Sequence, residues 1–289
     1  MIVRRFIALG VVATMIGCTL LTDLSDLEGG PPDAFEASTK DGSPSDALSE
    51  APSCKGTHGA TSVLIDGKYC IDTTEITIDQ FQEFLNAVKG NFAPYLPETG
   101  LCDAINPVSP GWGQQPNPFD GGPPLGSAAA GDLNYCAVHA YCTWAGKRMC
   151  RDIGKTGSGD YAQRNNATVS EWFNVCSHGD DKLHTWAYGP TYDSGACAPQ
   201  DAMTAYPVAS FPACVGGYAG IFDMSGNVAE WTDECTYDPD AGCMPCCTAR
   251  TPGLGYPYES YAECNAVFES NPSIWFFYEV GGRCCSDPQ

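Results

Sequence analysis

The sequence predicts an α+β fold: an irregular single domain with little regular secondary structure and many disulfide bonds. Three observations lead to this prediction. Two segments show the apolar spacing of amphipathic helices, several short segments combine β-branched residues with turn residues, and the chain of 289 residues contains 17 cysteines. Its hydrophobic content of 43% is sufficient for a packed core, which excludes a wholly disordered chain.

The first residues predict export from the cytoplasm. Arg4 and Arg5 precede an apolar run that is too short to form a stable membrane-spanning helix. The run ends in Met-Ile-Gly-Cys, which resembles a bacterial lipobox. We therefore expect residues 1–17 to be a lipoprotein signal peptide and Cys18 to be the lipidated residue, with an ordinary secretory signal as the alternative. A lipidated Cys18 would anchor the protein to a membrane of the cell envelope, facing the periplasm or the cell exterior.

Residues 18–53 form the next segment, and their composition predicts a disordered acidic tether. They are rich in Asp, Glu, Ser, Pro and Gly, with no sustained apolar period. Such a segment buries too little surface to offset its ordering entropy. The globular domain is expected over residues 54–289.

The elements of this domain begin with a hairpin over residues 61–77, where Asp66-Gly67 supplies the turn. A helix follows, capped by Thr77 or Asp79. Its apolar face is formed by four residues: Phe81, Phe84, Leu85 and Val88.

A second helix is expected between Asp132 or Asn134, either of which can cap it, and Gly146. Residues 91–131 lie between the two helices and are mostly Pro, Gly and Asn, which predicts a long loop. The rest of the chain predicts short strands and turns.

The cysteines are the residues most directly tied to the compartment. Without Cys18, the remaining cysteines are even in number, and an exported chain is expected to pair them as disulfides. The adjacent pairs Cys246-Cys247 and Cys284-Cys285 should each bond to cysteines elsewhere, because neighbouring cysteines rarely meet disulfide geometry. A zinc site at Cys243–Cys247 is the alternative for that segment, although it lacks a second ligand pair of matching spacing.

The charge of the chain bears on its partners. Its formal net charge is −21, with only 14 Lys and Arg residues. This excludes the clustered basic surface that a phosphate backbone requires, so no nucleic-acid binding is expected.

Several motifs occur in an order that resembles one known family. They are YCIDTTEITIDQFQEFL, YCAVHAYCTWAGKRMCRDIG, SEWFNVCSHG, GIFDMSGNVAEWTDE and YEVGGRCC. Together they resemble the formylglycine-generating enzyme family, also called the sulfatase-modifying factor family. The resemblance covers about residues 70–285 and implies one irregular α+β domain related to the C-type lectin architecture.

The resemblance implies a structural calcium ion in the loop that precedes Trp231. Its ligands would be Gly226, Asn227, Val228 and Glu230, since calcium takes several oxygen ligands and glycine lets the backbone curl around an ion. The alternative is that Glu230 is a buried, hydrogen-bonded turn residue and Trp231 belongs to the core.

Other charged or polar side chains have structural interpretations. Lys147 and Arg148 are expected to form an internal salt bridge with Glu171, or alternatively to bind an anion. His139 lies on the second predicted helix and is expected to be a core histidine.

In this family, catalysis depends on two cysteines, so the cysteines indicate whether the chain is an enzyme. Its enzymes convert a sulfatase cysteine to formylglycine with O2 and a copper ion held by two thiolates, five positions apart after an Arg-Gly-Gly-Ser turn. Arg250 stands where that turn is expected, but Cys264 has no partner five residues away. We therefore expect a non-catalytic binding or structural surface protein. The alternative is a formylglycine-generating oxidase that uses copper.

An unknown protein or glycan partner is expected for such a binding protein. A group of aromatic residues late in the chain could line a cleft for a peptide or glycan, or could equally belong to the core. These residues are Tyr256, Tyr258, Tyr261, Trp275, Phe276 and Phe277.

Overall fold

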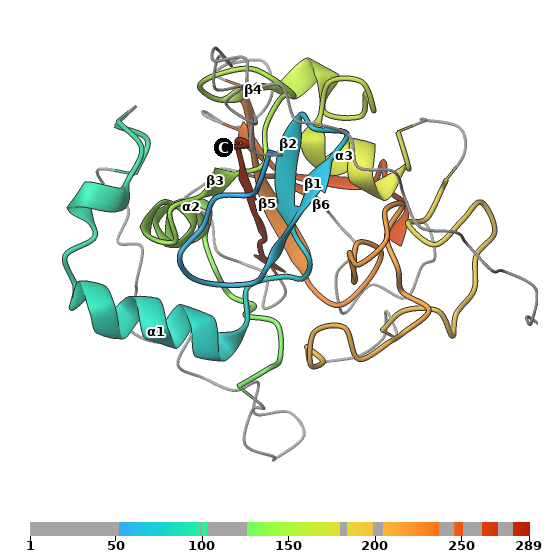
Figure 1. Cartoon of the computed structure of the whole chain (residues 1–289), viewed down its shortest axis with the longest axis horizontal. Coiled ribbons are helices and arrows are strands. Elements are labelled where there is room, and N and C mark those ends of the chain that lie inside the picture. Colours follow the sequence, from blue (N-terminus) through green and yellow to red (C-terminus); the bar gives the residue numbers. More distant parts are fainter. Residues whose placement is uncertain are drawn as a thin grey trace, which may run out of the picture. The chain divides into compact units, whose positions relative to one another are not determined.

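A computed structural model of the chain describes residues 52–98, 100–102, 126–179, 184–198, 205–236, 246–250, 262–270 and 280–289. All of these residues belong to one compact unit, residues 50–289 (Figure 1). The signal peptide, Cys18, almost all of the predicted tether and the aromatic group between Tyr256 and Phe277 lie outside the described residues.

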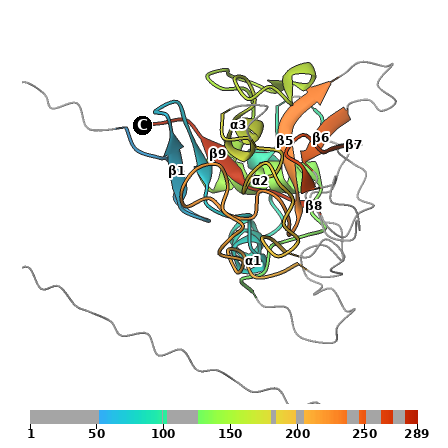
Figure 2. The same ribbon diagram turned by 90° about the vertical axis from the view of Figure 1, so that its right-hand side faces the viewer.

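The predicted hairpin opens the first sheet. Strands β1 (Ser62–Ile65) and β2 (Tyr69–Asp72) pair antiparallel, and Asp66 and Gly67 between them have φ angles of 48° and 69°. Two consecutive residues with positive φ are typical of a tight hairpin turn, so the Asp-Gly signal is confirmed. Strands β9 (Cys284–Ser286) and β3 (Arg148–Met149) complete the sheet, whose strand order is β1-β2-β9-β3. The C-terminal strand β9 therefore lies between the hairpin and β3. Figure 2 shows β9 beside the hairpin that contains β1.

The second sheet is built around the long strand β5. Its strands are β4 (Gly159–Asp160), β5 (Ala229–Thr236), β6 (Cys246–Arg250), β7 (Val267–Ser270) and β8 (Val280–Gly281). The order is β4-β5-β6-β7, and β8 also pairs with β5. Strand β5 runs antiparallel to β6 and parallel to β4 and β8.

The first predicted helix is confirmed as α1 (Ile78–Val88). Thr77 caps it in a reciprocal capping box with Gln80, and Phe81, Phe84 and Val88 are buried. Part of the predicted loop after α1 forms a short 3-10 helix, η1 (Ala93–Tyr95), while residues 103–125 lie outside the described part.

The second predicted helix is confirmed as α2 (Tyr135–Trp144). Asn134 is the capping residue, since its side chain accepts a hydrogen bond from the amide of Ala137 at 2.8 Å. Two shorter elements follow, η3 (Tyr161–Gln163) and α3 (Glu171–Cys176), and Ser170 caps α3.

The apolar core has two main clusters. One gathers α1, α2 and β5 around Phe84, Tyr141 and Trp231. The other lies around Trp172 of α3 and joins Ile65, Ile71 and Ile221. Strand β9 contributes to both clusters, through Cys284 in the first and Cys285 in the second.

Seven disulfides among the described residues link these elements. They are Cys54–Cys70, Cys102–Cys136, Cys142–Cys284, Cys150–Cys285, Cys176–Cys264, Cys197–Cys214 and Cys235–Cys247. The adjacent Cys284 and Cys285 bond to two different elements, α2 and the residue after β3, as the sequence predicts. These two bonds close loops of more than a hundred residues, so they restrict the unfolded chain strongly.

The other adjacent cysteine pair follows the same rule. Cys247 bonds across the sheet to Cys235, and Cys246 is also disulfide-bonded. Neither sulfur is a free thiolate, so both favour the disulfide interpretation of this segment over the zinc site.

The structure also bears on membrane spanning. Within the described ranges, no helix has the length and apolar character needed to cross a membrane.

Candidate functional site

The predicted calcium loop leads directly into β5. Gly226 has a φ of +154°, and an added Cβ would lie 3.0 Å from the Cβ of Cys197. Both the conformation and the close approach require glycine at this position. Asn227 follows with a φ of 69°, and Val228 is fully buried. The loop is therefore a tight, buried turn, in which all four predicted residues lie close along the chain.

The side chain of Asn227 is used to hold a neighbouring segment. Its Oδ1 accepts from the amide of Tyr206 at 2.8 Å, and its Nδ2 donates to the carbonyl of the same residue at 3.3 Å. Asn227 thus mimics a strand partner for Tyr206, and its oxygen already has a donor.

Glu230 is fully buried and surrounded by donors. Arg283 donates from Nε to both carboxylate oxygens, at 2.9 and 2.8 Å, and from Nη2 to Oε1 at 2.7 Å. Trp172 donates from Nε1 to Oε2 at 2.7 Å. Charge-assisted bonds of this kind are the strong ones, and both oxygens take part. The contacts of Glu230 agree with the alternative interpretation, a buried and hydrogen-bonded residue.

Two further acids lie near this pair, and we call Glu75, Asp223, Glu230 and Arg283 the Arg283 centre. Asp223 is 1% exposed, and its Oδ2 accepts from the amide of Ala209 at 2.6 Å. Burial raises the pKa of Asp223 to about 6, against the opposing effects of the Ala209 hydrogen bond and the Arg283 charge, and repulsion from Glu230 adds to the rise.

Glu75 is the most unusual member of the centre. It is fully buried, and neither of its side-chain oxygens has a hydrogen-bond partner among the described residues. Burial raises its pKa well above the ordinary value, and repulsion from Asp223 and Glu230 raises it further against the attraction of Arg283. A buried carboxyl without a donor is costly when ionised, so Glu75 favours a proton or a nearby cation.

The charges of the Arg283 centre do not cancel. Three carboxyl groups lie within electrostatic range of one guanidinium, which forms its ion pair with Glu230, and all four side chains are almost completely buried. The carboxyl oxygens of Glu75, Asp223 and Glu230 do not lie within 4.8 Å of one another as a set of three, so these side chains do not form a close set of metal ligands. Both oxygens of Glu230 are already held by Arg283 and Trp172.

Close clusters of metal-ligating side chains point elsewhere. Among the described residues, the single group of three such side chains within 4.8 Å of one another is Cys150, Glu171 and Cys285. Cys150 and Cys285 form a disulfide, and Glu171 is bonded to Arg148. This group is therefore explained by internal bonding.

The predicted ion pair between Arg148 and Glu171 is confirmed. Arg148 donates from Nη1 and Nη2 to the two oxygens of buried Glu171, both at 2.7 Å, and also contacts Asp287. Lys147 instead pairs with Asp72 at 2.6 Å, where both side chains are buried. These cations are used inside the fold, which accounts for them without an anion ligand.

His139 fits its expected structural role. Its Nδ1 lies 3.0 Å from the carbonyl oxygen of Tyr95, and the ring lies near Tyr135. Burial lowers its pKa, against the raising effects of the Tyr95 carbonyl and Asp233.

The residues expected near a copper site have other roles. Cys264 is bonded to Cys176, with a sulfur–sulfur distance of 2.14 Å. Arg250 is fully buried and donates to Glu234 at 2.6 Å. All 15 cysteines in the described part of the chain are disulfide-bonded.

Comparison with known proteins decides the family. The model of the sulfatase-modifying factor enzyme 1-like domain matches residues 40–271. The chain belongs to this family. The match confirms the resemblance carried by the motifs, and with it the single irregular domain that they predict.

The solved structures that match the chain have low sequence identity to it. CarF is 16% identical, with 81% of this chain and 96% of CarF covered and a TM-score of 0.45. PvdO from Pseudomonas aeruginosa is 18% identical, with coverage of 76% and 80% and a TM-score of 0.44. Treponema denticola variable protein 1 is 16% identical, with coverage of 76% and 84% and a TM-score of 0.46. No curated protein matches the sequence.

Sequence reasoning missed three members of the Arg283 centre as site residues. Glu75, Asp223 and Arg283 each stand inside a quoted motif, but no spacing rule links positions so far apart in the chain. The sequence did carry a chemical signal for these three residues. Each is a charged residue within or beside an apolar or glycine-rich run, and a charge buried in such a run requires a partner.

Proposed function

We propose that this member of the sulfatase-modifying factor family is a lipid-anchored surface protein of the cell envelope with a non-catalytic binding or structural role. The observation that carries the proposal is the disulfide between Cys176 and Cys264. This bond uses the sulfur of Cys264, which was the candidate copper ligand in the later part of the chain.

The chemistry of copper supports this interpretation. A copper site of the family's kind needs two thiolates, because Cu(I) prefers soft sulfur donors. A disulfide sulfur carries no thiolate charge and is a poor ligand. Since every described cysteine is bonded in this way, an oxidase would have to reduce a structural disulfide first.

The same disulfides support the proposed location. Dense disulfide bonding is typical of oxidising compartments and is rare in a reducing cytoplasm. Together with the lipobox-like sequence that ends at Cys18, it supports an exported protein held to the membrane by its N-terminal lipid.

The decisive test of the non-catalytic role is a direct assay for the alternative. The full-length protein is loaded with Cu(I) and incubated in air with a Cys-x-Pro-x-Arg peptide, and the peptide mass is followed. We expect no formylglycine product from either the untreated protein or a sample first treated with mild reductant. Formation of the aldehyde by either sample would overturn the proposal.

A count of free thiols complements this assay. Alkylation without reductant, followed by mass spectrometry, is expected to label none of the 15 described cysteines. Labelling of Cys264 would show that its sulfur is available and would return the oxidase to consideration.

The anchor has its own test. Replacing Cys18 by Ser is expected to move the protein from the membrane fraction to the soluble fraction. Retention of the variant in the membrane would show that a lipid on Cys18 is not what holds it.

A further inference from the structure

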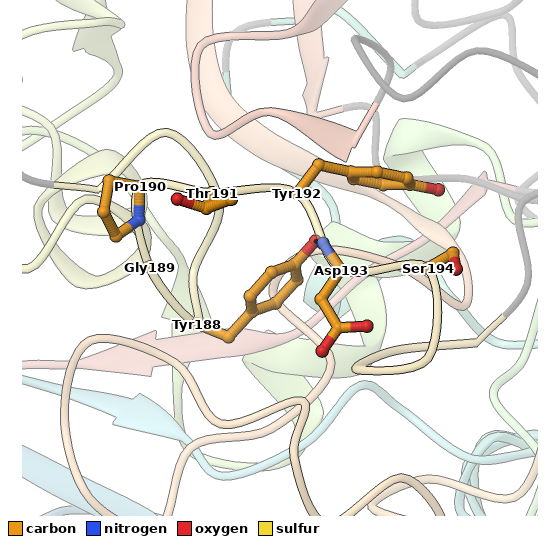
Figure 3. A pocket seen from close by; sticks show the side chains of 7 residues that line it. All are labelled: Tyr188, Gly189, Pro190, Thr191, Tyr192, Asp193 and Ser194. Carbon is orange, nitrogen blue, oxygen red and sulfur yellow. Dashed lines mark hydrogen bonds between the residues drawn. The ribbon is translucent and has the colours of Figure 1, made fainter.

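A surface hollow lies in the loop that follows α3 and precedes the calcium-predicted turn. Its volume is about 600 Å³, and it is lined by seven consecutive residues, Tyr188 to Ser194 (Figure 3). This volume is in the range of small-molecule sites. The figure shows the ring of Tyr188 beside Asp193 and the ring of Tyr192 above them, extending in another direction.

The two tyrosine rings of this hollow lie near the ring of a buried tryptophan, Trp186. Trp186 is 8% exposed, and its ring centroid lies 5.6 Å from that of Tyr192 and 6.5 Å from that of Tyr188. The rings of Trp186 and Tyr188 are nearly parallel, with an angle of 15° between their planes. The tyrosines are half-buried, so each keeps some ring surface and its hydroxyl end at the surface.

Backbone hydrogen bonds and a disulfide hold the loop in place. Trp186 and Gly189 exchange two backbone hydrogen bonds, at 3.0 and 2.9 Å, and the amide of Ala187 donates to the Oγ of Ser225 at 2.8 Å. Beyond the hollow, the disulfide between Cys197 and Cys214 fastens the chain to the segment before β5. A ligand would therefore meet a surface that is already organised, which reduces the entropy lost on binding.

The polar groups around the rings divide into used and available ones. The amide of Asp193 donates to the hydroxyl of Tyr188 at 3.3 Å, and the Oδ1 of Asp193 accepts from the amide of Gly195 at 2.9 Å. In contrast, the Oδ2 of Asp193 and the hydroxyls of Thr191, Tyr192 and Ser194 have no hydrogen-bond partner among the described residues. The backbone amides of Thr191, Tyr192 and Ser194 also have no hydrogen-bond partner among the described residues.

The chemistry of the lining indicates the kind of ligand. The hollow is lined by two tyrosine rings, the hydroxyls of Thr191 and Ser194, and the carboxylate of Asp193. A pyranose ring presents apolar C–H faces that pack on aromatic rings and hydroxyls at its edge that bond to carboxylates and hydroxyls. The net charge of −21 and exposed Asp193 disfavour an acidic polysaccharide.

We infer that the hollow formed by Tyr188 to Ser194 binds a neutral oligosaccharide of pyranose units. Tyr192 packs against a sugar face, Trp186 supports that ring from below, and Asp193 accepts hydrogen bonds from sugar hydroxyls. This inference deepens the proposed function, because it gives the binding protein a ligand class. It rests on the proposed function for its biological role, whereas the binding itself is measured independently.

Binding is tested with the full-length protein in a detergent that has no sugar headgroup. The probes are five neutral tetrasaccharides, of β-1,4- and α-1,4-linked glucose, β-1,4-linked N-acetylglucosamine, mannose and galactose, with decaproline as the peptide comparison. Ligand-observed NMR detects binding, and titration calorimetry gives the affinity. We expect at least one tetrasaccharide to bind and decaproline not to bind.

Variants then locate the site. Tyr192→Ala should weaken binding by about tenfold, since it removes the stacking ring, whereas Tyr192→Phe should retain most of the affinity. Asp193→Asn should weaken binding without changing the melting midpoint. The matched control is Tyr161→Ala, which removes a half-buried surface tyrosine of η3, away from the hollow, and should leave affinity unchanged.

Three results would overturn the inference: no tetrasaccharide binds, decaproline alone binds, or Tyr192→Ala binds as the wild type does. The copper assay distinguishes this failure from failure of the proposed function. A protein that makes no formylglycine and binds no tetrasaccharide keeps the non-catalytic role and loses only the saccharide site.

Discussion

Two buried arginines each form an ion pair with a glutamate of β5, but the other groups around the two pairs differ. Arg250 pairs with Glu234 and Arg283 pairs with Glu230, and both glutamates belong to β5. Both guanidinium groups are 1% exposed or less. The two pairs therefore share a strand and a degree of burial, and they differ in what else surrounds them.

Arg250 has a single carboxylate partner in the described part of the chain. Its other acceptors are neutral: the side-chain oxygens of Asn165 and Ser170 and the carbonyl of Arg164. The guanidinium also lies 5.2 Å from the ring of Trp172. Burial lowers the pKa of Arg250, against the raising effect of Glu234. This pair joins β5 and β6 to the turn before α3, with one charge facing one charge.

Arg283 instead bonds to Glu230 and lies within electrostatic range of Asp223 and Glu75. Burial lowers the pKa of Arg283. The attraction and hydrogen bonds of Glu230, together with the attraction of Glu75 and Asp223, outweigh this effect and raise the pKa. Because burial and mutual repulsion raise the pKa values of Glu75 and Asp223, protons stabilise the folded state of this centre. An equal depth of burial therefore does not imply an equal dependence on pH and ions.

The largest expected effect is the loss of Arg283. Arg283→Met leaves three buried carboxyls without their cation and should lower the free energy of unfolding by about 3–5 kcal/mol, measured by denaturant at pH 7 with the disulfides intact. Arg283→Lys keeps the charge but not the double hydrogen bond, so its loss should be smaller. If Arg283→Met does not fold, the Lys variant still provides the comparison. A loss below about 1 kcal/mol for the Met variant would contradict the assignment.

Arg250→Met should cost less, about 3 kcal/mol, because one carboxyl is left behind and it keeps its bond to Thr232. Double variants sharpen the contrast. Adding Glu234→Gln to Arg250→Met should recover most of the loss, whereas adding Glu230→Gln to Arg283→Met should recover less, since Asp223 and Glu75 remain. Equal recovery at the two centres would show that the surplus acids do not matter.

The pH dependence should follow the Arg283 centre. The folded pKa values of Glu75 and Asp223 are raised, so the folded state binds protons more tightly than the unfolded state. Their contribution to stability is present below about pH 4 and is lost as the pH rises toward about 6 and beyond, by roughly 1 kcal/mol per pH unit for each titrating group. Glu75→Gln should flatten this slope, measured by denaturant unfolding with chelator present. Exposed Glu98 gives the control variant, Glu98→Gln, whose slope should match the wild type.

Calcium should have the smallest effect. If an ion joins the Gly226–Glu230 loop, adding chelator at pH 7 should lower the melting midpoint by a few degrees, because a ligand that binds only the folded state stabilises it. The effect should shrink at pH 5, where protons compete for the same carboxyls. An unchanged midpoint at pH 7 would contradict the expectation of a calcium ion in this loop.

Much of the fold was predictable because its signals are local. The Asp66-Gly67 turn, the capping of α1 by Thr77 and the start of α2 at Asn134 each depend on neighbouring residues, and the structure confirms all three. The ion pair of Arg148 with Glu171 was predicted from two family motifs, and the two residues are 23 positions apart in the sequence.

The sequence by itself predicted export, many disulfide bonds and no nucleic-acid binding, and its ordered motifs indicated the family to which the chain belongs. Its composition and ordered motifs carry that information. Only the tertiary structure decided that Cys264 bonds to Cys176, that Glu230 binds Arg283, and that Glu75 and Asp223 lie beside them. Pairing and burial join residues up to two hundred positions apart, and the cost of burying a charge depends on which neighbours the fold brings to it.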